Sequence, residues 1–177
     1  NSLKVVGVEN IPDEGPFIIA PNHQSVLDGP LTMAGLGWKQ TSDCYFYATE
    51  DHVQGAVVRF LAKHHNIVVM ERRNLKSSIV RLADVLRHGK NVVIFPEGSR
   101  THDGNMSGFK RTFAILSQEL DVPIVPVRIT GAFEALPRGR RIPNRTDITV
   151  EYLKPVMPDK LLSYEDLAEK VRDAIKG

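Results

Sequence analysis

The chain has 177 residues, a length that suits one domain with a sizeable hydrophobic core and is short for two ordinary domains. Hydrophobic residues make up 42% and charged residues 25%, which excludes a disordered tail, a collagen-like repeat and a disulfide mini-protein. The 23 basic and 21 acidic side chains leave a net charge of +2, which favours neither nucleic acid nor a strongly anionic partner. The single cysteine, Cys44, cannot form an internal disulfide or a cysteine-rich metal site.

The sequence contains no uninterrupted apolar run that approaches the ~20 residues needed to span a bilayer. It opens on a strand-like stretch rather than on a signal peptide. Because it begins with Asn1 and not with methionine, we expect residues 1–177 to form a single domain excised from a longer chain.

The first half of the chain alternates short apolar runs with segments of helical pattern. Leu3–Val8 and Phe17–Ala20 are predicted strands, and the second is apolar throughout, as is typical of a strand buried on both faces of a sheet. A helix is expected over much of Ser25–Leu36, and Asn66–Met70 is predicted to be the next strand.

The second half repeats this alternation. Asn74 is the predicted N-cap of a helix that ends before Gly89, a residue suited to the C′ position. Ser163 and Asp166 resemble a capping box at the start of a last helix. The remaining predicted elements are a helix over Phe109–Leu120 and the strands Val92–Phe95, Val122–Ile129 and Ile148–Leu153. The order of elements predicts an α/β fold, a layered αβα domain with a mixed, mostly parallel sheet.

Charged clusters follow three of the predicted buried strands. They are Pro21–Asp28, Glu71–Arg72 and Phe95–Arg100. Any one of them alone could equally be the polar rim of a loop. In open α/β sheets, however, ligands bind beyond the carboxyl ends of the strands, so three clusters at one sheet edge predict a single site.

His23 and Asp28 are the candidate proton-transfer pair in the first cluster. Histidine can accept a proton near neutral pH, and a carboxylate can hold its ring in one tautomer. A spacing of five residues within a regular helix would set the two side chains roughly 140° apart. They can therefore meet only if His23 lies in the loop and Asp28 lies in the first turn of the helix.

The stretch Phe95–Arg100 is more specific. Its proline and its glycine are costly inside regular structure, so their position after a strand indicates a shaped loop. Arg100 suits a phosphate, because a guanidinium group can bind two oxygens at once. Glu97 has two interpretations that do not exclude each other, a contact to a bound ligand and a structural salt bridge to an arginine of another loop.

Four segments together resemble the conserved blocks of the glycerolipid acyltransferases, the lysophosphatidic acid acyltransferase family. Asn22–Asp28 is similar to its N-H-x-x-x-x-D block, and Phe95–Arg100 matches its F-P-E-G-[ST]-R block. Val69–Arg72 resembles the second block, and Val122–Val127 resembles the proline-containing fourth block. The segments follow the family's order across most of the chain. The resemblance implies a glycerol-phosphate-acyltransferase-like fold.

The resemblance also implies transfer of a fatty acyl group from acyl-CoA or an acyl-acyl-carrier-protein to the hydroxyl of a lysolipid. By this analogy His23 is the general base, Asp28 supports it, and the alkoxide attacks the thioester directly, without a metal, a resident cofactor or an acyl-enzyme. The family assigns acceptor and phosphate binding to the positions matched by Arg72, Glu97, Gly98, Ser99 and Arg100.

Two positions depart from the family pattern. Many members that use phosphate-bearing acceptors have a lysine after the first helix, where Thr49 stands here, and the second block usually has aspartate in place of Glu71. The expected acceptor is therefore lysophosphatidic acid or another lysophospholipid.

A basic loop, residues 138–145, contains four arginines. It could meet anionic lipid headgroups or the phosphates of coenzyme A, or it could be a solvated loop. With no spanning segment, the expected location is the cytoplasmic face of a membrane, held peripherally or by segments outside this sequence. An acyl carrier protein is a candidate partner, and we expect no binding to nucleic acid.

Several other residues have ordinary interpretations. The pair His64–His65 resembles a metal site only superficially, because neighbours in a helix point to different faces. Trp38 and the run Tyr45–Tyr47 are expected in the core, with an acyl channel as the alternative. Lys110–Arg111 either opens a helix that faces the site or is simply exposed.

Two other classes of function compete with the acyltransferase. One is a phosphate- or lipid-binding module of a larger synthetase that has kept the loops without turnover. Intact His23 and Asp28 argue against it, because binding alone needs no proton acceptor. The other is a thioesterase, for which the commonest serine-hydrolase motif, G-x-S-x-G, is absent.

Overall fold

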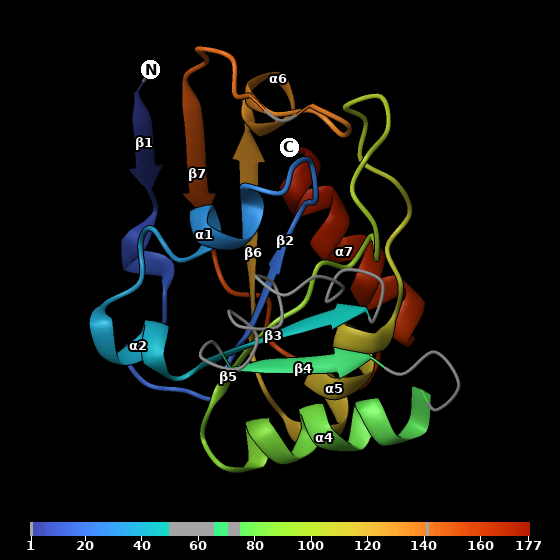
Figure 1. Cartoon of the computed structure of the whole chain (residues 1–177). Coiled ribbons are helices and arrows are strands. Elements are labelled where there is room, and N and C mark those ends of the chain that lie inside the picture. Colours follow the sequence, from blue (N-terminus) through green and yellow to red (C-terminus); the bar gives the residue numbers. More distant parts are fainter. Residues whose placement is uncertain (1, 50–65, 71–74, 141) are drawn as a thin grey trace.

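A seven-stranded sheet forms the centre of the described structure, in the order β1-β7-β6-β2-β5-β3-β4 (Figure 1). The computed structural model describes residues 2–49, 66–70, 75–140 and 142–177. Neighbouring strands run parallel except for the antiparallel pair β6 and β7, so the predicted mixed, mostly parallel sheet is confirmed. The strands are β1 (Leu3–Val6), β2 (Ile18–Pro21), β3 (Cys44–Thr49), β4 (Ile67–Met70), β5 (Asn91–Val93), β6 (Ile124–Thr130) and β7 (Ile148–Tyr152).

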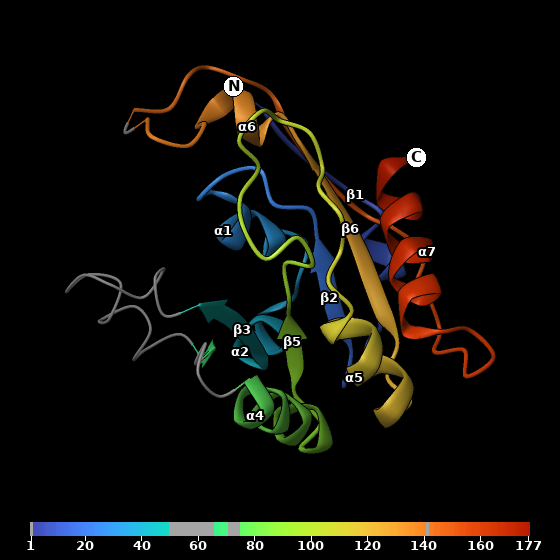
Figure 2. The same ribbon diagram turned by 90° about the vertical axis from the view of Figure 1, so that its right-hand side faces the viewer.

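Helices cover both faces of this sheet, which gives the predicted αβα layers (Figure 2). One core cluster joins the sheet to α4, α5 and α7, and a second fills the opposite face beneath α1. The helices are α1 (Asp28–Thr32), α2 (Trp38–Ser42), α4 (Leu75–Arg87), α5 (Thr112–Leu120), α6 (Ala132–Ala135) and α7 (Tyr164–Lys176), with a 3-10 turn, η1, at Val8–Asn10.

Strand β2 runs through the middle of both core clusters. Ile18 and Ala20 belong to one cluster, whereas Phe17 and Ile19 belong to the other, because alternate side chains of a strand point to opposite faces. All four residues are fully buried. The expectation of a strand buried on both faces is therefore confirmed.

The predicted caps at Gly89 and Ser163 are confirmed, whereas the helix expected over Phe109–Leu120 begins only at Thr112. Gly89 follows α4 with φ +72°, and the amide of Lys90 donates to the carbonyl of Val85, as in a Schellman motif. The Ser163 hydroxyl accepts a hydrogen bond from the Asp166 amide at the start of α7. The predicted N-cap Asn74 lies outside the described residues.

The helix expected over Ser25–Leu36 is much shorter in the structure. Helix α1 begins at Asp28 and ends at Thr32. Before it, the amide of Ser25 donates to the Asp28 carboxylate, which replaces a first helical turn with a side-chain-capped loop. After it, the amides of Met33 and Ala34 bond three residues back, so the backbone tightens and leaves the α-helical path.

Strand β3 was not predicted, although it lies inside the sheet between β5 and β4. Its aromatic run Tyr45–Tyr47 packs partly buried against the two cores, which agrees with the core interpretation. Burial raises the pKa of the Cys44 thiol at the start of the strand to about 12. The core expectation is wrong for Trp38, whose side chain is 89% exposed at the beginning of α2.

The sheet topology determines where a site can form. Because β2, β3, β4, β5 and β6 are parallel, their carboxyl ends meet at one edge. The chain leaves β2 at Asn22, leaves β5 toward Phe95, and leaves β6 at Gly131.

Among the described residues, no helix has the length and the apolar character that a membrane span requires.

Candidate active site

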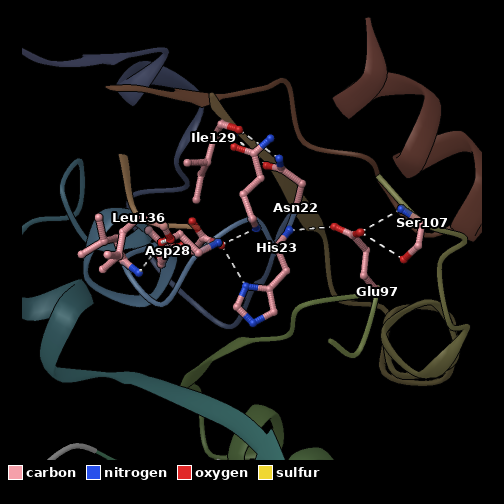
Figure 3. Close-up of polar contacts among 11 residues, drawn as sticks. Asn22, His23, Asp28, Glu97, Ser107, Ile129 and Leu136 are labelled. Atoms are coloured by element: carbon pink, nitrogen blue, oxygen red, sulfur yellow. Dashed lines mark hydrogen bonds and ion pairs between the residues drawn. The ribbon is translucent and has the colours of Figure 1, made fainter. Parts of the chain in front are cut away.

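His23 and Asp28 meet at the end of β2, as the sequence required of them. His23 lies in the loop, Asp28 is the first residue of α1, and the histidine Nδ1 is 2.8 Å from the Asp28 Oδ2 (Figure 3). The Asp28 side chain is fully buried, whereas the His23 side chain is 16% exposed. The pair therefore presents an accessible imidazole that is supported from beneath by a buried carboxylate.

The bonds around Asp28 determine the tautomer of His23. The Asp28 Oδ2 also accepts hydrogen bonds from the amides of Gln24, at 2.6 Å, and Ser25, at 2.7 Å. An ionised carboxylate only accepts hydrogen bonds, so the histidine proton lies on Nδ1. This assignment leaves the lone pair of Nε2, which has no partner among the described residues, to accept a proton from a substrate.

Asn22 fixes the end of β2 immediately before the histidine. Pro21 ends the strand, and the amide of Asn22 makes the next backbone bond toward β6, to the Val127 carbonyl at 3.3 Å. The Asn22 side chain extends this contact, because its Nδ2 donates to the Ile129 carbonyl at 2.9 Å and its Oδ1 accepts from the Ile129 amide at 2.7 Å. The loop that carries His23 therefore starts from a rigid point on the sheet (Figure 3).

The loop after β5 holds the backbone of His23 from the other side. The His23 amide donates to the Glu97 Oε1 at 2.7 Å, and the His23 carbonyl accepts from the Thr101 amide at 2.9 Å. The imidazole ring stacks on Phe95, with ring centroids 4.1 Å apart and planes inclined by 26°. The first and third sequence blocks are thus joined through the histidine.

Glu97 is buried, with 6% of its surface exposed, and both of its carboxylate oxygens are occupied. Oε1 accepts from His23, and Oε2 accepts from the amide of Ser107 at 2.8 Å and from its hydroxyl at 3.0 Å (Figure 3). Among the described residues Glu97 forms no salt bridge with an arginine. Its carboxylate instead accepts hydrogen bonds from His23 and Ser107.

Gly98, Ser99 and Arg100 continue this loop at the surface beside His23. Gly98 has φ +73°, a backbone conformation that favours glycine, and the Lys110 side chain lies over it. Ser99 is exposed and Arg100 is partly exposed. The Arg100 guanidinium makes no hydrogen bond or ion pair within the described residues, which leaves all its donors available to a ligand.

Two of the other interpretations can be compared with the structure, and two cannot. Arg111 is the N-cap of α5 and pairs with Glu165 of α7, whereas Lys110 lies over Gly98 beside the site. Arg72 and the pair His64–His65 lie outside the described residues. Within the described ranges, no three histidine, cysteine or acidic side chains converge as a metal site would require.

Sequence reasoning missed several residues that shape the site. Asn22 and Ser25 stand inside the first block, so the motif itself was the available signal. The Ser25 hydroxyl donates to the Leu136 carbonyl at 2.7 Å and joins the histidine loop to the segment after α6. Ser107 lies outside every block, and nothing in its sequence context marks it.

The basic loop lies between α6 and β7 and begins close to Leu136, whose carbonyl accepts the hydrogen bond from Ser25. Arg138, Arg140 and Arg145 are exposed, and Ile142 is 79% exposed. The Arg138 Nη1 lies 2.9 Å from the His102 Nε2 of the loop after β5. Exposed positive charge therefore lies at the same sheet edge as His23.

Comparison with known proteins agrees with this geometry. A family model described as Acyltransferase matches residues 2–130. The chain is 28% identical over 162 residues to the chloroplastic 1-acyl-sn-glycerol-3-phosphate acyltransferase BAT2 of Brassica napus, which covers 88% of this chain and 45% of the relative. It is 30% identical over 178 residues to the 1-acyl-sn-glycerol-3-phosphate acyltransferase of Limnanthes douglasii, covering 98% and 59%.

A human relative and a solved structure extend the comparison. The chain is 26% identical to 1-acyl-sn-glycerol-3-phosphate acyltransferase alpha, covering 98% of this chain and 62% of that protein, so it spans about half to two thirds of these relatives. The crystal structure of the 1-acyl-sn-glycerophosphate acyltransferase of Thermotoga maritima superposes with a TM-score of 0.85 and 28% identity, covering 99% of this chain and 69% of that one. With the family match spanning most of its length, this chain belongs to the acyltransferase family.

Proposed function

We propose that this chain is an O-acyltransferase that moves a fatty acyl group from a thioester to the hydroxyl of a lysolipid. The observation that carries the proposal is the His23–Asp28 pair, with Nδ1 held by a buried carboxylate at 2.8 Å and the free Nε2 on an accessible ring. Nε2 removes the hydroxyl proton of the acceptor while the hydroxyl oxygen attacks the carbonyl carbon of the thioester. The new C–O bond forms, the C–S bond breaks, and the leaving thiolate takes the proton from the imidazolium.

We assign acceptor binding to the loop after β5 and to Arg72, which follows β4 in the sequence. Arg100 and Arg72 bind the phosphate of the acceptor, while Gly98 and Ser99 shape the surface beside it. Glu97 supports the site through the chain itself, because its oxygens already accept three hydrogen bonds. The donor is acyl-CoA or an acyl-acyl-carrier-protein, and direct transfer needs no other cofactor.

The names of the relatives favour a 1-acylglycerol-3-phosphate acceptor, and Thr49 in place of the family's lysine keeps other lysophospholipids as candidates. Incubating the chain with a radiolabelled acyl thioester, with and without each lysolipid, tests the proposal. Labelled phospholipid that forms only when a lysolipid is present supports transfer. Free fatty acid as the main product would identify a thioesterase, and no product would identify a binding module.

Replacing Arg100 with alanine should raise the KM for the phosphate-bearing acceptor by roughly 10–100-fold, because a charge-assisted hydrogen bond contributes about 1.5–3 kcal/mol. The KM for the acyl thioester should change little. Initial rates with each substrate varied in turn measure both constants. The guanidinium has no partner among the described residues, so its removal should leave the fold intact.

Arg87→Ala is the matched control, because Arg87 is exposed on α4 and bonds only locally, to Asp84. Its kinetics should equal those of the wild type. If Arg100→Ala raised both KM values equally, the assignment of Arg100 to the acceptor would be wrong. Comparing lysophosphatidic acid with monoacylglycerol, which has no phosphate, sharpens the result, since only the former should lose affinity.

We also propose that the basic loop brings this chain to an anionic membrane surface, from which the lysolipid enters. Each of its arginines should contribute about 1 kcal/mol near anionic lipid. Binding to anionic vesicles should therefore be weak, should fall as salt rises, and should be absent for neutral vesicles, because exposed charges are screened over ~8–10 Å. Replacing Arg138, Arg140 and Arg145 with glutamine should abolish most of the binding to anionic vesicles. Co-sedimentation with anionic and with neutral vesicles, at two salt concentrations, measures the binding of each protein.

The control variant replaces Lys160, Lys170 and Lys176 with glutamine, which removes the same charge from exposed positions in and before α7. Its vesicle binding should stay close to that of the wild type. Tight, salt-independent binding to neutral vesicles would instead indicate an apolar insertion surface. Unchanged binding by the arginine variant would show that the basic loop is solvated surface.

A further inference from the structure

We propose that Ser107 is a positioning residue for the general base, and that it acts through Glu97 on the backbone of His23. Ser107 lies ten residues beyond Glu97, outside all the sequence blocks. Ser107 and Glu97, together with the amide of Thr101, form what we call the histidine clamp, which holds the backbone amide and carbonyl of His23 in place. The geometric part of this inference stands alone, whereas its effect on turnover rests on the proposed function.

The first part of the clamp is a short hydrogen-bond relay. The His23 amide donates to the Glu97 Oε1 at 2.7 Å, and the Ser107 amide and hydroxyl donate to Oε2 at 2.8 and 3.0 Å. Glu97 is only 6% exposed, and a buried carboxylate is costly unless donors surround it. Ser107 supplies two of the three donors, so it keeps the charged Glu97 oriented toward the His23 amide.

The second part of the clamp holds the backbone carbonyl of His23. The amide of Thr101, which lies between Glu97 and Ser107 in sequence, donates to the His23 carbonyl at 2.9 Å. One segment therefore bonds both backbone groups of His23. Since the Asp28 carboxylate and the Phe95 ring already restrain the imidazole, the clamp completes the restraint of the residue.

The loop that joins the two parts is stiffened by its own side chains. The Thr101 hydroxyl accepts from the Gly104 amide at 3.1 Å, and Asp103 accepts from the amide and the side chain of Asn105 at 3.0 and 2.8 Å. The side-chain bond from Asn105, together with that residue's amide, lowers the pKa of the Asp103 carboxyl. The bonded loop returns Ser107 to Glu97 in a defined position.

The clamp also gives Glu97 a role that its contacts show, because its carboxylate accepts three hydrogen bonds from the chain itself. A catalytic group must stay within a fraction of an ångström of its productive position, and its supporting contacts provide that accuracy. Loosening the clamp should therefore slow the chemical step and leave substrate binding almost unchanged. A residue that merely stabilised the fold would not separate kcat from KM in this way.

The test compares Ser107→Ala, which removes the hydroxyl donor, with Ser107→Thr, which restores it. We expect the hydrogen-exchange protection of the His23 amide to fall about three- to tenfold in Ser107→Ala and to recover in Ser107→Thr, since one net hydrogen bond is lost and regained. The kcat should fall by a similar factor, with both KM values unchanged. Glu97→Gln, which keeps the shape and removes the charge, should show the same pattern more strongly.

Ser42→Ala is the matched control, because Ser42 is an exposed serine whose hydroxyl bonds only to the nearby Lys39 carbonyl. It should change neither measurement. If protection of the His23 amide stayed at the wild-type level in both Ser107→Ala and Glu97→Gln, the clamp would be refuted, whatever the activity. If protection fell as expected in a chain that transfers no acyl group, the clamp would stand and the proposed function would fail.

Discussion

Replacing His23 with alanine should lower acyl transfer by about 10²–10⁴-fold, the range typical of losing a positioned general base. In the proposed mechanism the lysolipid hydroxyl is a weak nucleophile until its proton is removed, and Nε2 of His23 is the base that removes it. The KM values should change much less, because the imidazole acts on a proton and not on the phosphate or the acyl chain. Initial rates with a labelled acyl thioester measure the loss.

The variant should remain folded, because the His23 ring lies in a loop and is partly exposed. Its backbone bonds to Glu97 and Thr101 do not depend on the side chain. His88→Ala is the matched control, since His88 is exposed next to α4 and its ring bonds only to the local Asp84 carbonyl. Turnover near the wild-type level in a folded His23→Ala would refute the proposed mechanism.

Replacing Asp28 with asparagine should lower kcat by roughly 10²-fold or more, because the uncharged amide no longer supports the imidazolium that forms during transfer. The structure makes this substitution unusually informative. Oδ2 accepts all three hydrogen bonds, whereas Oδ1 is buried without a partner in the described part of the chain. An asparagine can place its side-chain oxygen where Oδ2 lies and its amide nitrogen where Oδ1 lies. The three hydrogen bonds can then be kept while the negative charge is lost.

Asp28→Ala should lose more activity than Asp28→Asn, because it also frees the His23 ring and leaves two loop amides without their acceptor. Asp84→Asn, an exposed aspartate paired locally with Arg87, is the control and should behave as the wild type. The kcat and the thermal midpoint should be measured for each variant. Full activity in Asp28→Asn would reduce Asp28 to a cap for α1.

Local chemistry in the sequence was enough to predict much of the fold. Strand β2 was recognised because burial on both faces requires an unbroken apolar run. The end of α4 was recognised because Gly89 can adopt φ +72° without strain. Strand β3 was not predicted, although the aromatic residues of its run Tyr45–Tyr47 are of types enriched in strands, because its place in the sheet depends on pairing with β5 and β4.

Part of the site was also predicted from local sequence. His23, Asp28 and the loop through Arg100 were predicted from residue types and spacing, since proton transfer and phosphate binding require those groups. The contact between His23 and Asp28 was predicted on one condition, that His23 lies in the loop and Asp28 in the first turn of the helix, and that condition is met. Local physics determines such contacts, because few residues separate the partners.

Only the tertiary structure decided the contacts between distant segments. The bonds from Asn22 to Ile129 and from Ser25 to Leu136 join residues more than a hundred positions apart. Which carbonyl lies opposite each side chain depends on the order of strands in the sheet, and no periodicity in the sequence encodes that order. Ser107 is the clearest case, because a serine in a polar loop looks the same whether it faces water or holds Glu97 against the backbone of His23.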